Sequence, residues 1–334
     1  MSARGTYSTK FPCRRLATSR SLSSPKPIDI PEAPRLLPTP ADSIMEMIPS
    51  IPAYKSVIVG MTLDPQFFQG VPLPSWIELS LIDVCNRVCS FCPKSDDKVA
   101  PNTHQKMERL LIDKLHNDLK DINYQGSFCL CGYGEPLLYK DINYTISKLS
   151  DLGAVEIITN GDPLNKKRLI EIYNSKTSRL IISLYDGPEQ LSKFKDTIKD
   201  AAIGDDLVIL RDRWYSDKID YGVKLTNRAG TISIGNQPDV KDYKNRKCFY
   251  TAYSVLIDWN GDIFLCPQDW QRRISIGNLM QKHFFDIWNG SIMNKYRNNL
   301  LRGKRCDNPC KSCNADGQVQ GDLHAQEWNK IYKI

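Results

Sequence analysis

Short apolar runs alternate with longer amphipathic stretches from about residue 76 to residue 211. The runs have the length and composition of β-strands, and between them apolar residues recur every three to four positions, as in helices. The predicted strands cover 76–82, 127–131, 155–159, 179–185 and 206–211, and a candidate sixth strand covers 230–234. The predicted helices cover 107–122, 140–153, 164–174 and 188–202. Strands that alternate with helices indicate a parallel sheet, so the predicted fold class is α/β, with about six units in a curved sheet or partial barrel.

The first 50 residues differ from the rest of the chain. They are rich in Ser, Arg and Pro and predict a disordered tail, and residues 51–73 form a lead-in segment. A Ser- and Arg-rich, acid-poor start is typical of an organelle import segment, and a flexible start is an equal alternative. No apolar run approaches the ~20 residues that span a bilayer. We therefore expect a cytoplasmic protein that does not enter membranes.

The charge of the chain is concentrated in this tail. Six lysines and arginines precede the first acidic residue, Asp29, and supply most of the formal net charge of +7. The remaining chain is close to neutral, whereas strong nucleic-acid binding needs clustered basic residues on the folded part. We therefore expect no nucleic-acid partner.

Polar motifs follow the predicted strands at their carboxyl ends. The Cys85 loop follows the first strand, Gly132–Pro136 the second and Thr159–Gly161 the third, while Ser183 and Arg211 stand near the ends of the fourth and fifth. The carboxyl ends of parallel strands share one rim, where β/α proteins build their active sites. The sequence therefore predicts one site at this rim.

Three cysteines stand within eight positions of the first rim loop, at Cys85, Cys89 and Cys92. Zinc normally takes four protein ligands, or three and a water, and no histidine stands nearby to complete such a site. Three thiolates can instead hold a [4Fe–4S] cluster and leave one iron without a protein ligand. That open iron could chelate a small molecule.

The Cys85-x3-Cys89-x2-Cys92 spacing, with Phe91 directly before the last cysteine, resembles the signature of radical S-adenosylmethionine (SAM) enzymes. The resemblance covers residues 74 to about 320. It implies a partial (β/α)6 barrel at 74–236 and a [4Fe–4S] cluster whose open iron binds SAM. It further implies that reductive cleavage of SAM produces a 5′-deoxyadenosyl radical, which takes a hydrogen atom from the substrate.

The same resemblance assigns SAM-binding roles to other rim residues. "GYGEP" is similar to the glycine-rich GGEP element that binds the SAM amino group, which carries over to Gly134, Glu135 and Pro136, although Tyr133 stands where the first of the paired glycines is usual. Phe91 is expected beside the adenine. Ser183 is similar to the residue that contacts the SAM ribose or carboxylate. Asn160 is either a SAM contact or a turn residue before Gly161.

A second group of cysteines lies near the C-terminus, at Cys248, Cys266, Cys310 and Cys313. Apolar runs on both sides of Asn260-Gly261 predict a β-hairpin that brings Cys248 and Cys266 together. Two separated thiol pairs fit either a zinc ribbon or an iron–sulfur site. The segment 237–320 resembles a SPASM/Twitch extension with hairpin and helix, which implies a second, auxiliary [4Fe–4S] cluster. Residues 321–334 are expected to be a C-terminal tail.

The remaining cysteines lack a clear assignment. Cys306 is a bystander, an alternative ligand or a thiol that donates a hydrogen atom, and Cys129 and Cys131 are expected to be buried as small apolar residues.

Two reactions fit the resemblance. Dehydrogenation of an alcohol would send the second electron to the auxiliary cluster, whereas epimerisation would use a thiol such as Cys306. The stretch 210–230 resembles sequences in relatives that act on carbohydrates or aminocyclitols, which places Arg211 at the substrate end. Arg213 lies either there or in an exposed loop. We favour dehydrogenation of a sugar or aminocyclitol. A peptide substrate and a non-catalytic zinc-binding module remain alternatives, and a radical enzyme needs an external one-electron reductant such as flavodoxin or ferredoxin.

Overall fold

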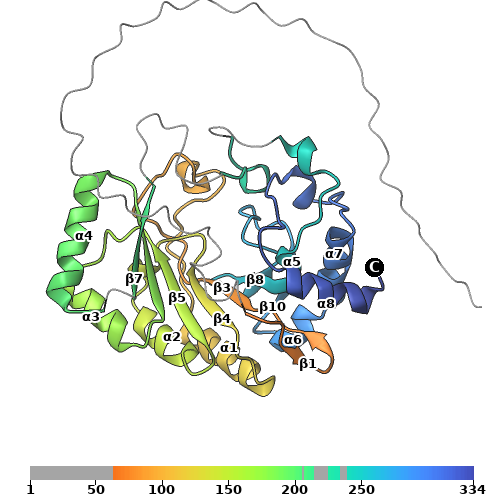
Figure 1. Ribbon diagram of the computed structural model, residues 1–334, viewed down its shortest axis with the longest axis horizontal. Helices are drawn as coiled ribbons and strands as arrows, with labels where there is room; N and C mark the ends of the chain where they lie inside the picture. Colours follow the sequence, from red (N-terminus) through yellow and green to blue (C-terminus); the bar gives the residue numbers. More distant parts are fainter. Residues whose placement is uncertain (1–62, 205–206, 214–224, 234–238) are drawn as a thin grey trace, which may run out of the picture. The chain divides into compact units, whose positions relative to one another are not determined.

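The computed structural model describes residues 63–204, 207–213, 225–233 and 239–334. These residues lie in one unit that spans Ala53–Ile334. Its centre is an eight-stranded sheet in the order β10-β9-β8-β3-β4-β5-β6-β7 (Figure 1). Six neighbouring strands of this sheet are parallel: β8 (Ser254–Ile257), β3 (Trp76–Ser80), β4 (Ser127–Cys131), β5 (Ala154–Thr159), β6 (Arg179–Leu184) and β7 (Val208–Asp212).

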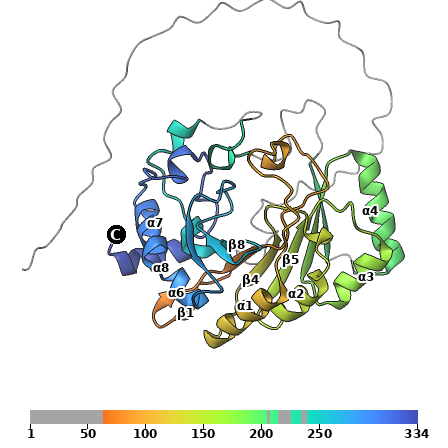
Figure 2. The same cartoon turned by 180° about the vertical axis from the view of Figure 1, so that it is seen from behind.

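Four helices connect the strands β3 to β7 in chain order: α1 (Arg109–Asp121), α2 (Ile142–Leu149), α3 (Lys166–Asn174) and α4 (Pro188–Ala201). Each turns an apolar stripe to the sheet, as Leu111, Ile112, Leu115 and Leu119 do in α1. Local signals set the ends, since the Asn165 side chain accepts a hydrogen bond from Arg168 N at the start of α3. The predicted α/β barrel fold is confirmed, and its helices lie on one side of the sheet (Figure 2).

The sixth parallel strand is not the predicted one. Arg228–Gly230 forms a 3-10 turn and residues 231–233 form no strand, while residue 234 lies outside the described part. The sixth strand is β8, which pairs in parallel with β3 and antiparallel with β9 (Asp262–Phe264). β8 is buried throughout, which suits a central strand, whereas Thr231 and Ile232 are partly exposed. The predicted hairpin is therefore confirmed, but its first strand belongs to the barrel sheet.

The C-terminal part packs beside this hairpin. It contains β10 (Ser275–Asn278) and the helices α5 (Tyr250–Tyr253), α6 (Phe284–Trp288), α7 (Ser291–Leu301) and α8 (Asp322–Tyr332). The expected tail at 321–334 is thus mostly helix α8, because His324, Ala325 and Trp328 form a buried stripe.

The fully buried Arg297 guanidinium lies 3.8 Å from the Trp328 ring centroid and 4.2 Å from that of Trp288.

The lead-in segment contributes a two-stranded hairpin, β1 (Phe67–Phe68) with β2 (Val71–Pro72), and residues 51–62 lie outside the described part. No helix among the described residues is both long and apolar enough to cross a membrane.

Candidate active site

A cavity of about 290 Å³ lies at the carboxyl ends of the parallel strands. Nine of the predicted site residues line it: Cys85, Cys89, Phe91, Cys92, Gly134, Glu135, Asn160, Ser183 and Arg211. Pro136 stands just behind its wall, as the buried first residue of the 3-10 turn Pro136–Leu138. Arg213, by contrast, does not line the cavity. The predicted rim residues therefore come together in space.

The loop with the three cysteines is held by its own backbone and by the segment that follows it. Cys92 N donates to Cys89 O at 2.9 Å, and Cys85 N donates to Asn102 Oδ1 at 3.1 Å. Lys94 is buried beneath the loop, where Nζ donates to Pro101 O at 2.9 Å. All three thiols thereby face one cavity.

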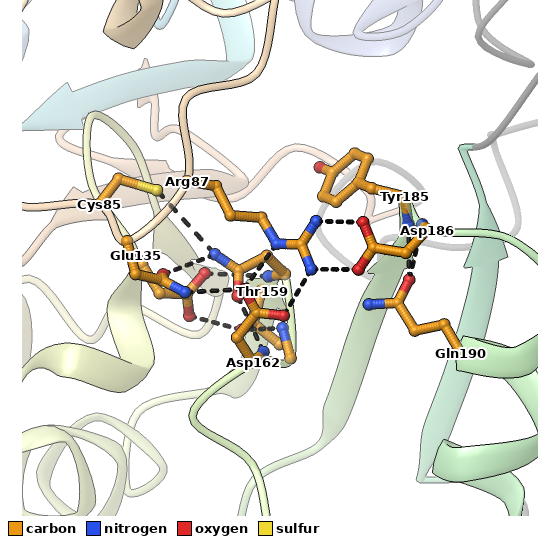
Figure 3. Close-up of polar contacts among 11 residues, drawn as sticks. Cys85, Arg87, Glu135, Thr159, Asp162, Tyr185, Asp186 and Gln190 are labelled. Atoms are coloured by element: carbon orange, nitrogen blue, oxygen red, sulfur yellow. Dashed lines mark hydrogen bonds and ion pairs between the residues drawn. The ribbon is translucent and has the colours of Figure 1, made fainter.

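Arg87, between the first two cysteines, ties this loop to two other strand ends (Figure 3). Its guanidinium makes paired hydrogen bonds to Asp162, at 2.6 Å each, and to Asp186, at 2.5 and 2.7 Å. Asp162 follows β5 and Asp186 follows β6. The sequence interpretation missed this clamp, whose only signal was an acidic residue shortly after each of these two strands.

Glu135 joins three rim loops through its carboxylate and its backbone N–H (Figure 3). Its Oε1 accepts from Thr159 Oγ1 at 2.5 Å and from Leu137 N at 3.0 Å, and its Oε2 accepts from Asn160 N at 2.9 Å. Glu135 N donates to Val84 O, next to Cys85, at 2.8 Å. Burial raises the pKa of Glu135, and these hydrogen bonds counteract that rise. A carboxylate has about four acceptor sites, so one remains for a ligand donor such as an ammonium group.

Asn160 connects the third rim loop to the cysteine loop. Its Nδ2 donates to Asn86 Oδ1 at 2.9 Å and lies 3.9 Å from Cys85 Sγ, while its Oδ1 accepts from Asp162 N at 2.9 Å. The residue is buried beside the first thiol. The structure therefore gives Asn160 more than the turn role that its sequence context alone suggested.

The "GYGEP" loop approaches the cysteine loop closely. A Cβ at Gly134 would lie 2.2 Å from Ile82 O and 2.7 Å from Val84 O, so only glycine fits there. Tyr133, which replaces the first of the usual paired glycines, is buried. The centroid of its ring lies 4.8 Å from that of Trp270. Its hydroxyl donates to Asp269 O at 2.9 Å. The larger side chain is thus accommodated by packing against the C-terminal part.

Two aromatic rings and an arginine form a further part of the cavity wall. Phe91 lies 5.6 Å from Tyr185 between ring centroids. Arg211 Nη2 donates to Ser183 Oγ at 2.9 Å, and its Nε is buried without a hydrogen-bond partner among the described residues. A buried donor without a partner is costly, so this atom is a place where a bound molecule would be held.

A second, smaller cavity collects the C-terminal cysteines. All four predicted ligands line it: Cys248, Cys266, Cys310 and Cys313. Its other walls are mostly apolar, as with Leu265 and Leu300. Tyr250 and Gln268 line both cavities, so the two sites are neighbours. Cys306 is exposed and lines neither.

Both sets of thiols suit iron–sulfur clusters. Burial and the neighbouring thiols raise the pKa of Cys89 to about 12, and burial raises the pKa of Cys248 to about 11. Thiols held together in this way become thiolates when cationic metal offsets their repulsion. Among the described residues, no three His, Cys, Asp or Glu side chains converge on a single-ion site. A [4Fe–4S] cube takes each thiolate on a different iron, so thiols spread around a cavity fit it.

Comparison with protein-family models gives two matches. Residues 79–203 match the radical SAM superfamily, and residues 248–314 match SPASM, an iron–sulfur cluster-binding domain. The chain belongs to the radical SAM superfamily. It carries a SPASM domain, as the resemblance of segment 237–320 predicted. As a radical SAM enzyme it uses SAM, a [4Fe–4S] cluster and an auxiliary iron–sulfur cluster, so the alternative of a non-catalytic zinc module is wrong.

The matches with individual relatives cover nearly the whole length of each relative. The S-adenosyl-L-methionine-dependent 2-deoxy-scyllo-inosamine dehydrogenase of Niallia circulans is 27% identical over 245 residues, which are 72% of this chain and 92% of the relative. A crystal structure of BtrN in complex with AdoMet and 2-DOIA superposes with a TM-score of 0.62 at 26% identity, over 75% of this chain and 98% of BtrN. An open conformation of BtrN gives a TM-score of 0.56 at 22% identity, over 75% and 97%.

Proposed function

We propose that this enzyme is a radical SAM dehydrogenase that oxidises a secondary alcohol of an aminocyclitol, or of a closely related carbohydrate, to a ketone. The reaction of the 2-deoxy-scyllo-inosamine dehydrogenase supports this class of substrate, because the match covers 92% of that relative and 72% of this chain. The observation that carries the proposal is the position of the second cavity. Its four thiols lie beside the substrate cavity, with Tyr250 and Gln268 shared between the two.

The residues of the first cavity divide into three tasks. Cys85, Cys89 and Cys92 would hold the cluster that, with SAM bound, supplies the radical for hydrogen abstraction. Glu135, Asn160, Ser183, Phe91 and the Gly134 backbone would hold SAM beside them. Arg87 and Glu135 fix the loops on which these groups stand, because their side chains connect the loops at four strand ends.

The polar part of the wall suits a hydroxylated substrate. Arg211 offers an unpartnered Nε, and Arg228 and Gln268 also line the cavity. Arginine donates in a fixed planar geometry and stays charged, so it can hold and orient a substrate oxygen. Arg211 is therefore proposed to contact the substrate, as expected from its position at the end of β7.

The four thiols of the second cavity would hold the auxiliary cluster with no open iron. Oxidation of an alcohol to a ketone removes a hydrogen atom, a proton and one further electron, so an electron acceptor next to the substrate is required. The apolar walls exclude water from this acceptor. Epimerisation through Cys306 would need that thiol in the substrate cavity, and the exposed Cys306 does not line it.

The proposal is tested by a substrate panel in D2O. Reconstituted enzyme, SAM and a flavodoxin or chemical reductant are incubated with 2-deoxy-scyllo-inosamine, other aminocyclitols, neutral cyclitols and sugars. We expect a ketone that is two mass units lighter than its alcohol, together with 5′-deoxyadenosine. An alcohol of unchanged oxidation state that carries solvent deuterium at carbon would establish epimerisation instead.

A further inference from the structure

One carboxylate of the first cavity has no role in holding SAM or the clusters. Glu78 lies in the middle of β3, is 6% exposed, and lines the cavity. Charged residues are rarely buried inside a sheet, because desolvation of a carboxylate is costly unless hydrogen bonds or a counter-charge compensate it. A carboxylate kept there therefore calls for a function.

The surroundings of Glu78 leave it sparsely satisfied. Register places Cys129 of β4 on one side of it and Leu256 of β8 on the other. Its side-chain hydrogen bond is with Cys131, and Arg228 of the neighbouring 3-10 turn is the charged group that favours its ionised form. A thiol is a weak donor, so the carboxylate retains most of its capacity to accept.

Other groups in the cavity wall are less suited to accept a proton. Among the described lining residues the carboxylates are Glu78 and Glu135, and Glu135 already accepts three hydrogen bonds. Lys94 donates away from the cavity, to backbone carbonyls, and the arginines stay protonated. The Tyr133 hydroxyl donates to Asp269 O. Glu78 is therefore the carboxylate that is free to act on a substrate.

We propose that Glu78 is the catalytic base that accepts the hydroxyl proton of the substrate as the ketone forms. This inference rests on the proposed dehydrogenation. The substrate loses the hydrogen atom on carbon to the SAM-derived radical, the proton on oxygen to the Glu78 carboxylate, and one electron to the auxiliary iron–sulfur cluster. The C–H and O–H bonds break and the second C–O bond forms, so atoms and electrons balance.

The protonation behaviour of Glu78 agrees with this role. Burial raises the pKa of Glu78 to about 7, and Cys131 and Arg228 limit the rise. A base is most effective when its pKa is close to the working pH. The titratable and charged groups around it are Cys129 and Cys131 on β4, Arg228 on the turn and Tyr250 on α5, while β8 presents Leu256. Because the ionised form is the active one, ketone formation should rise as the pH passes through about 7 and level off above that pH.

The test compares Glu78→Gln with Glu156→Gln. Glu156 is a matched control, since it is fully buried on the same row of the sheet, next to Cys129, but lies outside the cavity lining and pairs with Arg179 at 3.9 Å. Iron content and melting temperature establish that each variant is folded and loaded. Substrate Kd, ketone formation and the pH profile of ketone formation are then measured for both variants and for the wild type.

We expect Glu78→Gln to lower ketone formation by about 10²–10⁴-fold, the usual contribution of general acid–base catalysis, and to lose the pH-dependent rise near 7. Substrate Kd should stay within about threefold, whereas the loss of a charged hydrogen bond would weaken binding about tenfold or more. In Glu78→Ala, added formate should restore ketone formation. Glu156→Gln should retain the pH profile of the wild type.

Two results would overturn the role of Glu78 alone while the wild type still makes ketone. The first is a Glu78→Gln variant that keeps its rate and pH profile. The second is a rise of substrate Kd that accounts for the whole loss of rate, which would make Glu78 a binding group for the substrate amine. A loaded wild-type enzyme that oxidises no alcohol in the panel would overturn the proposed function, and the role of Glu78 with it.

Discussion

The two cysteine-lined cavities differ in how the chain builds them. In the first, three thiols come from one short loop, Cys85 to Cys92, and the wall around them carries Glu78, Arg87, Glu135 and Arg211. In the second, four thiols come from segments far apart in sequence, Cys248 to Cys313, and most of the wall is apolar. The first is built to admit and orient polar molecules, whereas the second is built to keep them out.

One arginine from each cavity shows the same contrast. In the second, Arg305 donates to four backbone carbonyls, among them Ala315 O at 2.7 Å and Asp316 O at 2.8 Å. Its guanidinium is therefore committed to the fold. In the first, Arg211 keeps Nε unpartnered. The first cavity therefore keeps a donor for a bound molecule, whereas the guanidinium of the second holds the surrounding backbone.

The largest effect should come from Cys89→Ala. The variant removes one of the three proposed ligands of the first cluster, so SAM cleavage should stop. The four-thiol cavity does not depend on this loop, so iron should fall from about eight to about four per chain if both sites hold [4Fe–4S] clusters. Iron analysis and 5′-deoxyadenosine assays check this. Normal production of 5′-deoxyadenosine would show that the cluster is held elsewhere.

The double change Cys310→Ala with Cys313→Ala should have the converse effect. SAM cleavage should continue, because the first three thiols stand on a separate loop. Ketone formation should stop, since the second electron has no acceptor. Comparison of 5′-deoxyadenosine with ketone in the same sample separates the two steps. Undiminished ketone in this variant would mean that the second cavity takes no part in oxidation.

A smaller effect is expected from Glu135→Ala. This change removes two hydrogen bonds to the Thr159–Gly161 loop and one within the loop of Glu135, and SAM affinity should weaken by about tenfold, as expected for the loss of a charged hydrogen bond. Iron content should not change. Equilibrium binding of SAM to the reconstituted variant provides the measurement, and wild-type affinity would remove Glu135 from the binding site.

Arg87→Ala should hold the cysteine loop less firmly in place, without abolishing SAM cleavage or ketone formation. Arg87 makes paired bonds to both Asp162 and Asp186 and is mostly buried, so its loss should destabilise the protein by about 1–3 kcal/mol and hasten loss of iron to a chelator. Arg109→Ala is the matched control, because its ion pair with Asp141 is exposed and should contribute little to stability. Equal effects of the two changes on iron release would argue against the clamp.

The pH dependence of this clamp has a defined sign. Hydrogen bonds from Arg87 lower the pKa of Asp186, so the stabilisation is present above the ordinary aspartate pKa of about 3.9 and is lost as the pH falls through the lowered value. Arg87→Ala should therefore differ from wild type in stability at neutral pH and converge with it in acid.

The smallest effect should come from Cys306→Ala. The residue is exposed and lines neither cavity, so ketone formation should be unchanged. Loss of turnover with both clusters intact would instead favour a thiol-dependent epimerisation.

The sequence predicted what local patterns determine. Strand 127–131 and helix 164–174 agree with β4 and α3 to within two residues, since apolar spacing and end signals such as Asn165 are local. The spacing of Cys85, Cys89 and Cys92 identified the first thiol set because that spacing is local, whereas the second set was grouped by the predicted hairpin and by the resemblance of 237–320 to a SPASM/Twitch extension. The sixth parallel strand, β8, shows where local patterns stop being sufficient for prediction. β8 joins β3 from about 180 residues away in sequence, and such pairing depends on burial rather than on local pattern.

Side-chain pairs between residues far apart in the chain could likewise not be predicted from the sequence. The bonds of Arg87 to Asp162 and Asp186 join residues 75 and 99 positions apart. Glu78 looked like a polar position of an alternating strand, and only the register of β3 between β4 and β8 shows that it lies inside the barrel. Helix α8 was expected to be a tail because its buried stripe is short.

The division of work between the two cavities is tested most directly with an aminocyclitol deuterated at the carbinol carbon. The quantities to measure are the deuterium in 5′-deoxyadenosine and the amount of ketone, in wild type and in the Cys310→Ala, Cys313→Ala double variant. The account predicts one monodeuterated 5′-deoxyadenosine per ketone in wild type, and deuterated 5′-deoxyadenosine without ketone in the variant. Ketone that forms in equal yield in both proteins, or 5′-deoxyadenosine without deuterium beside wild-type ketone, would contradict it.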